Sequence, residues 1–170
     1  MNTPHVGFYP SKPQFAGRAI LMYFWNPDIR ESYSIMPAMD MLQKQHARDL
    51  VVIGVVSPIK SKDNQEVKLD PDVEKVQKRL EEFTRHYNLG HTQLIDLSGT
   101  LLNTAVNKDQ NAILLPWIAV MSSDNTLRWG GWLRLPAAQG AIDKVLAVDP
   151  GVKARQRAEE EYLRSTKANK

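Results

Sequence analysis

Two uninterrupted apolar runs, with a helical pattern between them, constrain the fold of this chain more than any other feature. The first run spans residues 19–25 and ends in aromatic side chains, whereas the second spans residues 50–56 and is rich in β-branched residues. Such runs are typical of parallel strands that are covered by helices on both faces. Apolar residues recur at helical spacing over residues 35–46. The order of strand, helix and strand therefore predicts a right-handed crossover in an α/β domain.

The polar turn after the first run is the expected place for a functional loop, because it lies at the carboxyl end of a buried strand. Its sequence is Asn26-Pro27-Asp28, and the helical segment follows it. Pro37 falls inside this segment, where a proline removes a backbone donor and collides with the preceding turn. We therefore expect one helix that is kinked at Pro37.

The remaining patterns extend the α/β core into a mixed sheet with flanking helices. A proline at the entry of a late apolar run, and a polar turn after that run, indicate a strand that returns as an antiparallel hairpin. The first predicted elements are a short edge strand or extended lead-in within residues 3–13, an exposed connection over 57–71, and a helix that Asp70-Pro71 starts, with Val73, Val76, Leu80 and Phe83 on its buried face. They are followed by a strand over 93–96, a short helix over 100–106, a strand over 113–121, its return over 127–130, and a helix over 137–148 with Ile142, Val145 and Leu146 inward.

The end of the chain reads as a charged helix. Basic residues exceed acidic ones by three from residue 151 onward, which accounts for the whole net charge of +3. This helix is predicted to pack on the domain or to project as an arm that pairs with a second copy. We divide the chain into a domain over residues 1–150, with a lead-in strand over 1–16, and a terminal helix over 151–170. The helix has a thin apolar stripe made of Ala154, Ala158, Tyr162 and Leu163.

Composition excludes several classes of function. The folded body carries no basic patch with aromatic or amide readers, so nucleic acid is not an expected partner. No apolar run reaches the roughly 20 residues that a membrane-spanning helix needs. The absence of cysteine excludes disulfides, thiolate catalysis and thiolate metal sites. We assign no catalytic residue, no metal ligand and no cofactor, and we expect surface positions for the histidines, which are His5, His46, His86 and His91.

The opening segment resembles the active-site region of the thioredoxin-like superfamily, in its TlpA-like or redoxin branch. The first run ends in Phe24-Trp25, and after a short turn and a helix start comes Met36-Pro37. The family motif Trp-Cys-x-x-Cys-x-x-x-Met-Pro can be laid on residues 28–37 without a gap. The second run, over residues 50–55, is similar to the next central strand of that family.

The late hairpin extends this resemblance. Leu115-Pro116 enters a strand at the place of the family's cis-proline, and Trp129-Gly130-Gly131 on the return resembles its Trp-x-Gly-like ending. Together these features cover residues 17–148 in the expected order. The resemblance implies a thioredoxin-like α/β fold with a central mixed sheet, to which this chain adds a terminal helix. It also implies a cis bond between Leu115 and Pro116. A flavodoxin-like sheet, the alternative, would have only parallel strands and no late hairpin.

The departure from the family pattern bears on function. Ile29 and Ser32 occupy the two cysteine positions, with Arg30-Glu31 between them. A serine hydroxyl cannot exchange with a disulfide, although it can accept a hydrogen bond from a backbone donor. Dithiol oxidoreductase, isomerase and peroxiredoxin activities are therefore excluded for this polypeptide as written.

We expect a redox-inactive domain that serves as a protein-binding, peptide-binding or structural module. The alternatives are an oxidoreductase-related enzyme or subunit with cysteine-independent or partner-supplied chemistry, and assembly through the terminal helix. The resemblance favours an extracytoplasmic location, whereas Met1 as the native start would favour the cytoplasm. The candidate binding residues are Trp25, Asp28, Ile29, Arg30, Glu31, Ser32, Leu115, Pro116 and Trp117.

Overall fold

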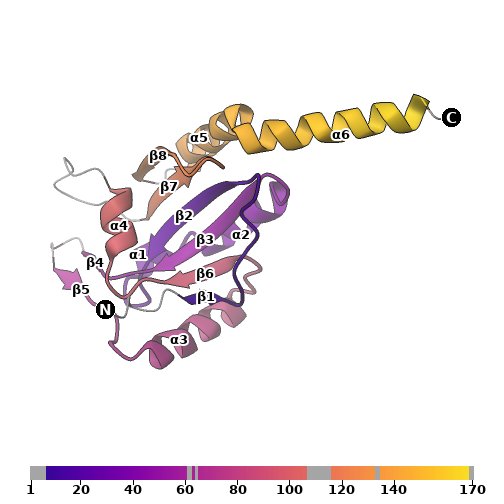
Figure 1. Cartoon of the computed structure of the whole chain (residues 1–170). Coiled ribbons are helices and arrows are strands. Elements are labelled where there is room, and N and C mark those ends of the chain that lie inside the picture. The colour runs from indigo at the N-terminus through magenta and orange to yellow at the C-terminus, as the bar shows by residue number, and fades with distance from the viewer. Residues whose placement is uncertain (1–6, 61–62, 64, 107–115, 133–134, 169–170) are drawn as a thin grey trace, which may run out of the picture.

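A six-stranded mixed sheet runs through the middle of the molecule (Figure 1). The computed structural model describes residues 7–60, 63, 65–106, 116–132 and 135–168. The order of the strands across the sheet is β1-β6-β3-β2-β7-β8. These strands are β1 (Gly7–Tyr9), β2 (Ala19–Trp25), β3 (Leu50–Val56), β6 (Thr92–Ile95), β7 (Trp117–Met121) and β8 (Leu127–Trp132).

The pairing of the strands follows the pattern of the sequence. The apolar strands β2 and β3 pair in parallel, and β6 continues the parallel part on the other side of β3. The strand β7 pairs antiparallel with β2, and β8 returns antiparallel on β7. The short strand β1 lies antiparallel at the edge beside β6. The predicted mixed sheet, edge strand and late hairpin are thus confirmed, and a wholly parallel flavodoxin-like sheet is excluded.

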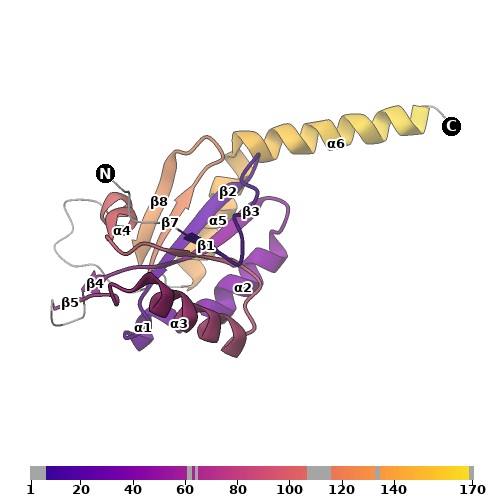
Figure 2. The same cartoon turned by 60° about the horizontal axis from the view of Figure 1, so that its bottom comes forward.

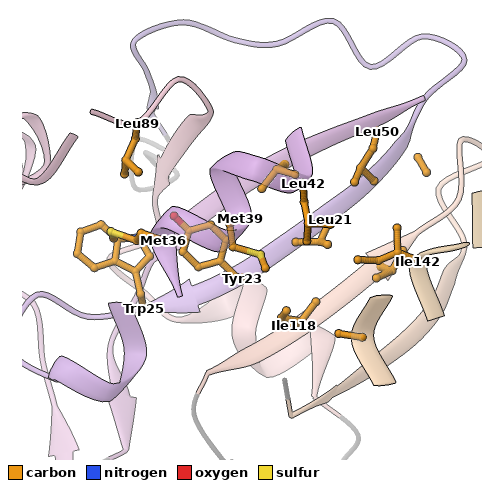
Figure 3. Close-up of a cluster of buried hydrophobic side chains, with 14 of the residues drawn as sticks. Leu21, Tyr23, Trp25, Met36, Met39, Leu42, Leu50, Leu89, Ile118 and Ile142 are labelled. Atoms are coloured by element: carbon orange, nitrogen blue, oxygen red, sulfur yellow. The ribbon is translucent and has the colours of Figure 1, made fainter. Parts of the chain in front are cut away.

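Helices cover both faces of the sheet (Figure 2). Side chains of α2, α3 and α5 pack on one face with the larger hydrophobic cluster, whereas α4 packs on the other face with the smaller cluster. Figure 3 shows Tyr23 and Trp25 of β2 in the larger cluster beside Met36 and Met39 of α2. The helices are α1 (Arg30–Tyr33), α2 (Met36–Gln45), α3 (Val73–His86), α4 (Thr100–Ala105), α5 (Leu135–Val148) and α6 (Pro150–Ala168).

The expected single helix kinked at Pro37 is wrong in its geometry. The chain forms a short helix α1 that ends at Tyr33 and a separate helix α2 that begins at Met36. Pro37 therefore lies in the first turn of α2, where its missing N–H group has no intrahelical partner to lose. The proline starts a helix here and does not bend one.

The connection over residues 57–71 is more structured than expected. It contains a two-stranded hairpin of β4 (Ile59–Lys60) and β5 (Glu66–Val67). Ile59 is 1% exposed and belongs to the smaller hydrophobic cluster. The polar composition of the connection hid this buried hydrophobic anchor.

The helix α6 projects from the end of the sheet as an arm (Figure 1). Near its start, Arg155 donates to the carbonyl oxygen of Gly17 at 3.1 Å and pairs with Asp49. One turn further, Glu159 pairs with Arg48. Residues 160–168 are all exposed. Of the two packing modes expected for the terminal helix, the structure thus has the projecting arm. No helix in the described part of the chain combines the length and apolar composition that crossing a membrane requires.

Candidate functional site

The loop that joins β2 to α1 is fixed by the hydroxyl group of Ser32. Its Oγ accepts a hydrogen bond from the backbone N–H of Asn26 at 2.9 Å. The same oxygen lies 2.5 Å from the carbonyl oxygen of Ile29 and 3.0 Å from that of Asn26, so its single proton is shared within the loop. Ser32 is 0% exposed. The expected acceptance of a backbone hydrogen bond is confirmed, and the donor is the loop itself.

The side chain of Asn26 ties the loop to two other segments. Its Nδ2 donates to the carbonyl oxygens of Ser57 and Val67, each at 3.1 Å. Its Oδ1 accepts from the backbone N–H of Asp28 at 2.9 Å. Because Asn26 is 0% exposed and all these contacts lie within the protein, the loop has a defined conformation without any bound group.

The exposed part of the loop is charged. Asp28, Arg30 and Glu31 are exposed, whereas Ile29 is buried in the smaller hydrophobic cluster. Arg79 of α3 donates to the carboxylate of Asp28 at 3.0 Å. Of the residues predicted for a binding surface in this loop, the structure therefore exposes the three charged side chains and covers Ile29 and Ser32.

The two tryptophans predicted to line the surface are both covered. Trp25 is 1% exposed, and its ring centroid lies 5.0 Å from that of Phe83. Trp117 is 3% exposed and pairs across the sheet with Phe24. Pro116 is buried next to Trp117. Leu115, and with it the predicted cis bond to Pro116, lies outside the residues that the structure describes.

Beneath the loop lies a buried polar network that the sequence did not reveal. The Nε1–H group of Trp25 donates to Oε1 of Gln93 at 3.1 Å, and Nε2 of Gln93 donates to the hydroxyl oxygen of Tyr23 at 3.2 Å. That hydroxyl lies 2.8 Å from Nε2 of His91, whose Nδ1 lies 3.1 Å from Oδ1 of Asp40. His91 is 2% exposed, so its expected surface position is wrong.

Gly54 makes room for this network. Tyr23, Gly54 and Gln93 lie in register on β2, β3 and β6, so their side chains would share one face of the sheet. A Cβ atom on Gly54 would lie 2.1 Å from Oε1 of Gln93 and 2.6 Å from the hydroxyl oxygen of Tyr23. The outer two side chains therefore meet over the glycine of the middle strand. A glycine inside an apolar strand is the one sequence signal for such a close approach.

Burial governs the ionisation of these groups. Burial raises the pKa of Tyr23 and lowers the pKa of His91, because it disfavours the charged form of each. Burial alone would raise the pKa of Asp40, but hydrogen bonds from Lys44, Gly90 and His91 hold it at about 2. At neutral pH the network thus contains a neutral tyrosine, a neutral histidine and an ionised aspartate.

The exposed side chains of the loop can make ionic contacts and hydrogen bonds. Ser32 is buried and engaged in hydrogen bonds, whereas Asp28, Arg30 and Glu31 present charged groups to solvent. Among the residues that the structure describes, no three acidic or histidine side chains gather in a way that could hold a metal ion.

Comparison with solved structures identifies the fold of the chain. No protein-family model matches the chain, and a search of curated proteins finds no match. Solved structures do match. A thiol-disulfide isomerase from Corynebacterium glutamicum has a TM-score of 0.61 at 9% identity, covering 82% of this chain and 90% of that one. An exposed lipoprotein thioredoxin from Streptococcus pneumoniae strain TIGR4 has a TM-score of 0.54 at 21% identity, covering 78% of this chain and 86% of that one.

A thiol:disulfide interchange protein of the thioredoxin family from Chlorobium tepidum TLS also matches, with a TM-score of 0.54 at 13% identity and coverage of 78% and 82%. The chain has the thioredoxin fold. The predicted fold class is thereby confirmed, and the absence of cysteine separates this thioredoxin fold from thiol-disulfide chemistry.

Proposed function

We propose that this thioredoxin-fold domain is a redox-inactive module that binds an extended polypeptide at the loop of residues 26–32 and the adjoining start of β7. The observation that carries this proposal is the engagement of Ser32, whose buried hydroxyl group fixes the loop by hydrogen bonds to the backbone of Asn26 and Ile29. A preorganised loop loses little conformational entropy when it binds a partner.

The charges of the loop define the contacts that a partner would make. Arg30 and Glu31 are exposed at the start of α1, and Asp28 is exposed beside Arg79. Exposed charges of both signs recognise a polar peptide and contribute mainly to specificity and to the rate of association. Pro116 and Trp117 are buried at the start of β7, so their side chains pack into the protein and the backbone there would make the contacts with a peptide.

The alternative of a cysteine-independent enzyme finds less support. General-base or nucleophilic catalysis needs a reactive side chain that substrate can reach. His91 and Ser32 are both buried and hydrogen bonded. Partner-supplied redox chemistry would still use the same loop as a docking surface.

Self-association through α6 is a second candidate, because the arm leaves its apolar stripe uncovered. Tyr162 is 68% exposed and Leu163 is 58% exposed. Light scattering on the full chain tests it: a dimer that Tyr162→Lys converts to a monomer would support pairing through the arm, whereas a monomer at millimolar concentration would exclude it.

A titration tests the binding proposal. The ¹⁵N-labelled full chain would be titrated with carboxymethylated insulin B chain, an unfolded polypeptide without free thiols. We expect chemical-shift changes centred on residues 26–33 and 116–117. The variant Arg30→Glu should weaken the binding several-fold, while the matched variant Arg164→Glu on the exposed arm should leave it unchanged. Shift changes confined to α6, or none at millimolar peptide, would contradict the proposal.

A further inference from the structure

The two ends of the buried network determine the direction in which each of its hydrogen bonds is donated. The indole of Trp25 can only donate a hydrogen bond, and the ionised carboxylate of Asp40 can only accept one. Four hydrogen bonds connect these ends through Gln93, Tyr23 and His91. Each link therefore needs one proton, and each must point toward Asp40.

This direction assigns the tautomer of His91. Its Nδ1 must carry the proton that is donated to Oδ1 of Asp40, and its Nε2 must accept from the hydroxyl group of Tyr23. The hydroxyl oxygen of Tyr23 in turn accepts from Gln93. Every polar atom along the chain is satisfied only when His91 is neutral.

A second proton on His91 would break this arrangement at one link. The new N–H group on Nε2 would face the hydroxyl group of Tyr23, and two protons would then occupy one hydrogen bond. The hydroxyl could not turn its proton toward Gln93, because Nε2 of Gln93 is itself a donor. A flipped Gln93 amide would only move the conflict to the donor-only indole of Trp25.

The charges around His91 do not compensate for this conflict. Asp40 attracts an imidazolium, but its carboxylate already accepts from Lys44 at 2.7 Å and from the backbone N–H of Gly90 at 2.7 Å. Lys44 repels the imidazolium. The ionisable groups that act on His91 are thus Asp40 and Lys44 from α2 and Tyr23 from β2, and their net effect with burial is to lower its pKa from 6.5.

We propose that Tyr23, His91 and Asp40 form a proton-sensitive latch that fastens α2 to β2 when His91 is neutral and loosens it when His91 takes up a proton. The latch is connected to the loop of residues 26–32 through Gln93, which donates to Tyr23 and accepts from Trp25, the residue that immediately precedes the loop. Acidification would therefore loosen the support of the proposed binding surface. The latch itself rests on the hydrogen-bond network and does not depend on the proposed function.

The test is a titration of the imidazole ¹⁵N signals of the full chain between about pH 7.5 and about pH 4.5, a range that brackets the ordinary histidine pKa. We expect His91 to remain the neutral Nδ1–H tautomer below a pH of about 6.5, where an unperturbed histidine takes up a proton. Hydrogen exchange of the α2 amides should then accelerate together with the protonation of His91. Protonation of His91 at or above the ordinary histidine pKa of about 6.5, or the Nε2–H tautomer at neutral pH, would overturn the proposal.

Two variants separate the latch from burial alone. Tyr23→Phe removes the donor to Nε2, so the pKa of His91 should rise toward its ordinary value, while the matched variant Tyr33→Phe should leave it unchanged. His91→Asn retains an N–H donor for Asp40 and cannot protonate, so the acid-induced acceleration of exchange in α2 should disappear. An unchanged His91 titration in Tyr23→Phe, or unchanged acceleration in His91→Asn, would exclude the latch.

Discussion

At the scale of single residues, Ser32 shows how one buried hydroxyl group fixes the loop between β2 and α1. The hydroxyl group of Ser32 satisfies the backbone N–H of Asn26 inside the protein, a role that requires a small polar side chain turned inward. The neighbouring Ile29 adds apolar contact to the smaller cluster. Both residues therefore contribute to the stability of the loop.

Replacement of Ser32 by alanine tests this role. The variant leaves the buried N–H of Asn26 without its partner, which costs about 1–3 kcal/mol in the free energy of unfolding. Urea unfolding measures the loss. Ser34→Ala is the matched control, because Ser34 is exposed and its hydroxyl donates to the carbonyl oxygen of Glu31 near the surface. Equal stability of the two variants would show that Ser32 does not fix the loop.

Gly54 offers a second test at this scale. In Gly54→Ala the new methyl group would overlap Oε1 of Gln93 and the hydroxyl of Tyr23, so we expect a loss of about 1–3 kcal/mol in the free energy of unfolding. The control is Gly140→Ala in α5, where nothing lies within 4 Å of the added methyl group. That substitution should stabilise the protein by about 0.5–1 kcal/mol, because glycine is unfavourable inside a helix. A neutral Gly54→Ala variant would contradict the described close approach.

At the scale of elements, α6 is an anchored arm whose anchor lies at its start. Asp149 caps the helix by accepting hydrogen bonds from the backbone N–H groups of Gly151 and Val152 at 2.9 and 3.0 Å. The same carboxylate accepts from the backbone N–H of Ser123 in the hairpin turn at 2.6 Å. At the other end of the helix, residues 160–168 are all exposed.

Because only the start of α6 is anchored, a change there should lower the stability of the protein, whereas removal of the exposed end should not. Asp149→Ala removes a buried acceptor for several donors and should lower the free energy of unfolding by about 2 kcal/mol. A chain that stops after residue 160 should keep the melting temperature of the full chain, because the residues removed are exposed. Calorimetry measures both, and a large loss on truncation would show that the outer arm packs on the body.

The elements could largely be predicted from the sequence, because apolar runs and helical spacing determine them directly. The strands β2 and β3 and the antiparallel return of β8 lie where the patterns predicted them. The sequence patterns did not predict the break in the helix before Pro37 or the burial of Ile59 in β4, because each depends on tertiary packing around one residue.

The candidate site could be predicted only in part. The loop was identified from its position after a buried strand, but the burial of Trp25 depends on a contact with Phe83 of α3, which lies far away in the sequence. The network of Tyr23, His91 and Asp40 joins residues up to 68 positions apart. No local pattern encodes such a contact.

At the scale of the whole molecule, Asp40 makes stability depend on acid. Its pKa of about 2 in the folded protein is below the ordinary value of 3.8, so the unfolded chain binds more protons as the pH falls between these values. The free energy of unfolding should therefore decrease over this range. Urea unfolding at stepped pH measures it, and Asp40→Asn should show a shallower decrease than the parent chain. An equally steep decrease in that variant would assign the acid sensitivity to other carboxylates.

The central claim is that residues 29 and 32 lie in the turn that follows β2 in this thioredoxin fold, close enough for two cysteines placed there to bond to each other. Thiol titration of the variant Ile29→Cys/Ser32→Cys after oxidation with diamide tests it most directly. The backbone N–H of residue 32 already bonds to the carbonyl oxygen of residue 29 at 3.0 Å, so both positions share the first turn of α1. We expect both thiols to disappear into an intramolecular disulfide in a monomeric, folded protein, whereas Ile29→Cys/Ser34→Cys should keep its thiols. Free thiols or cross-linked dimers in the first variant would contradict the claim.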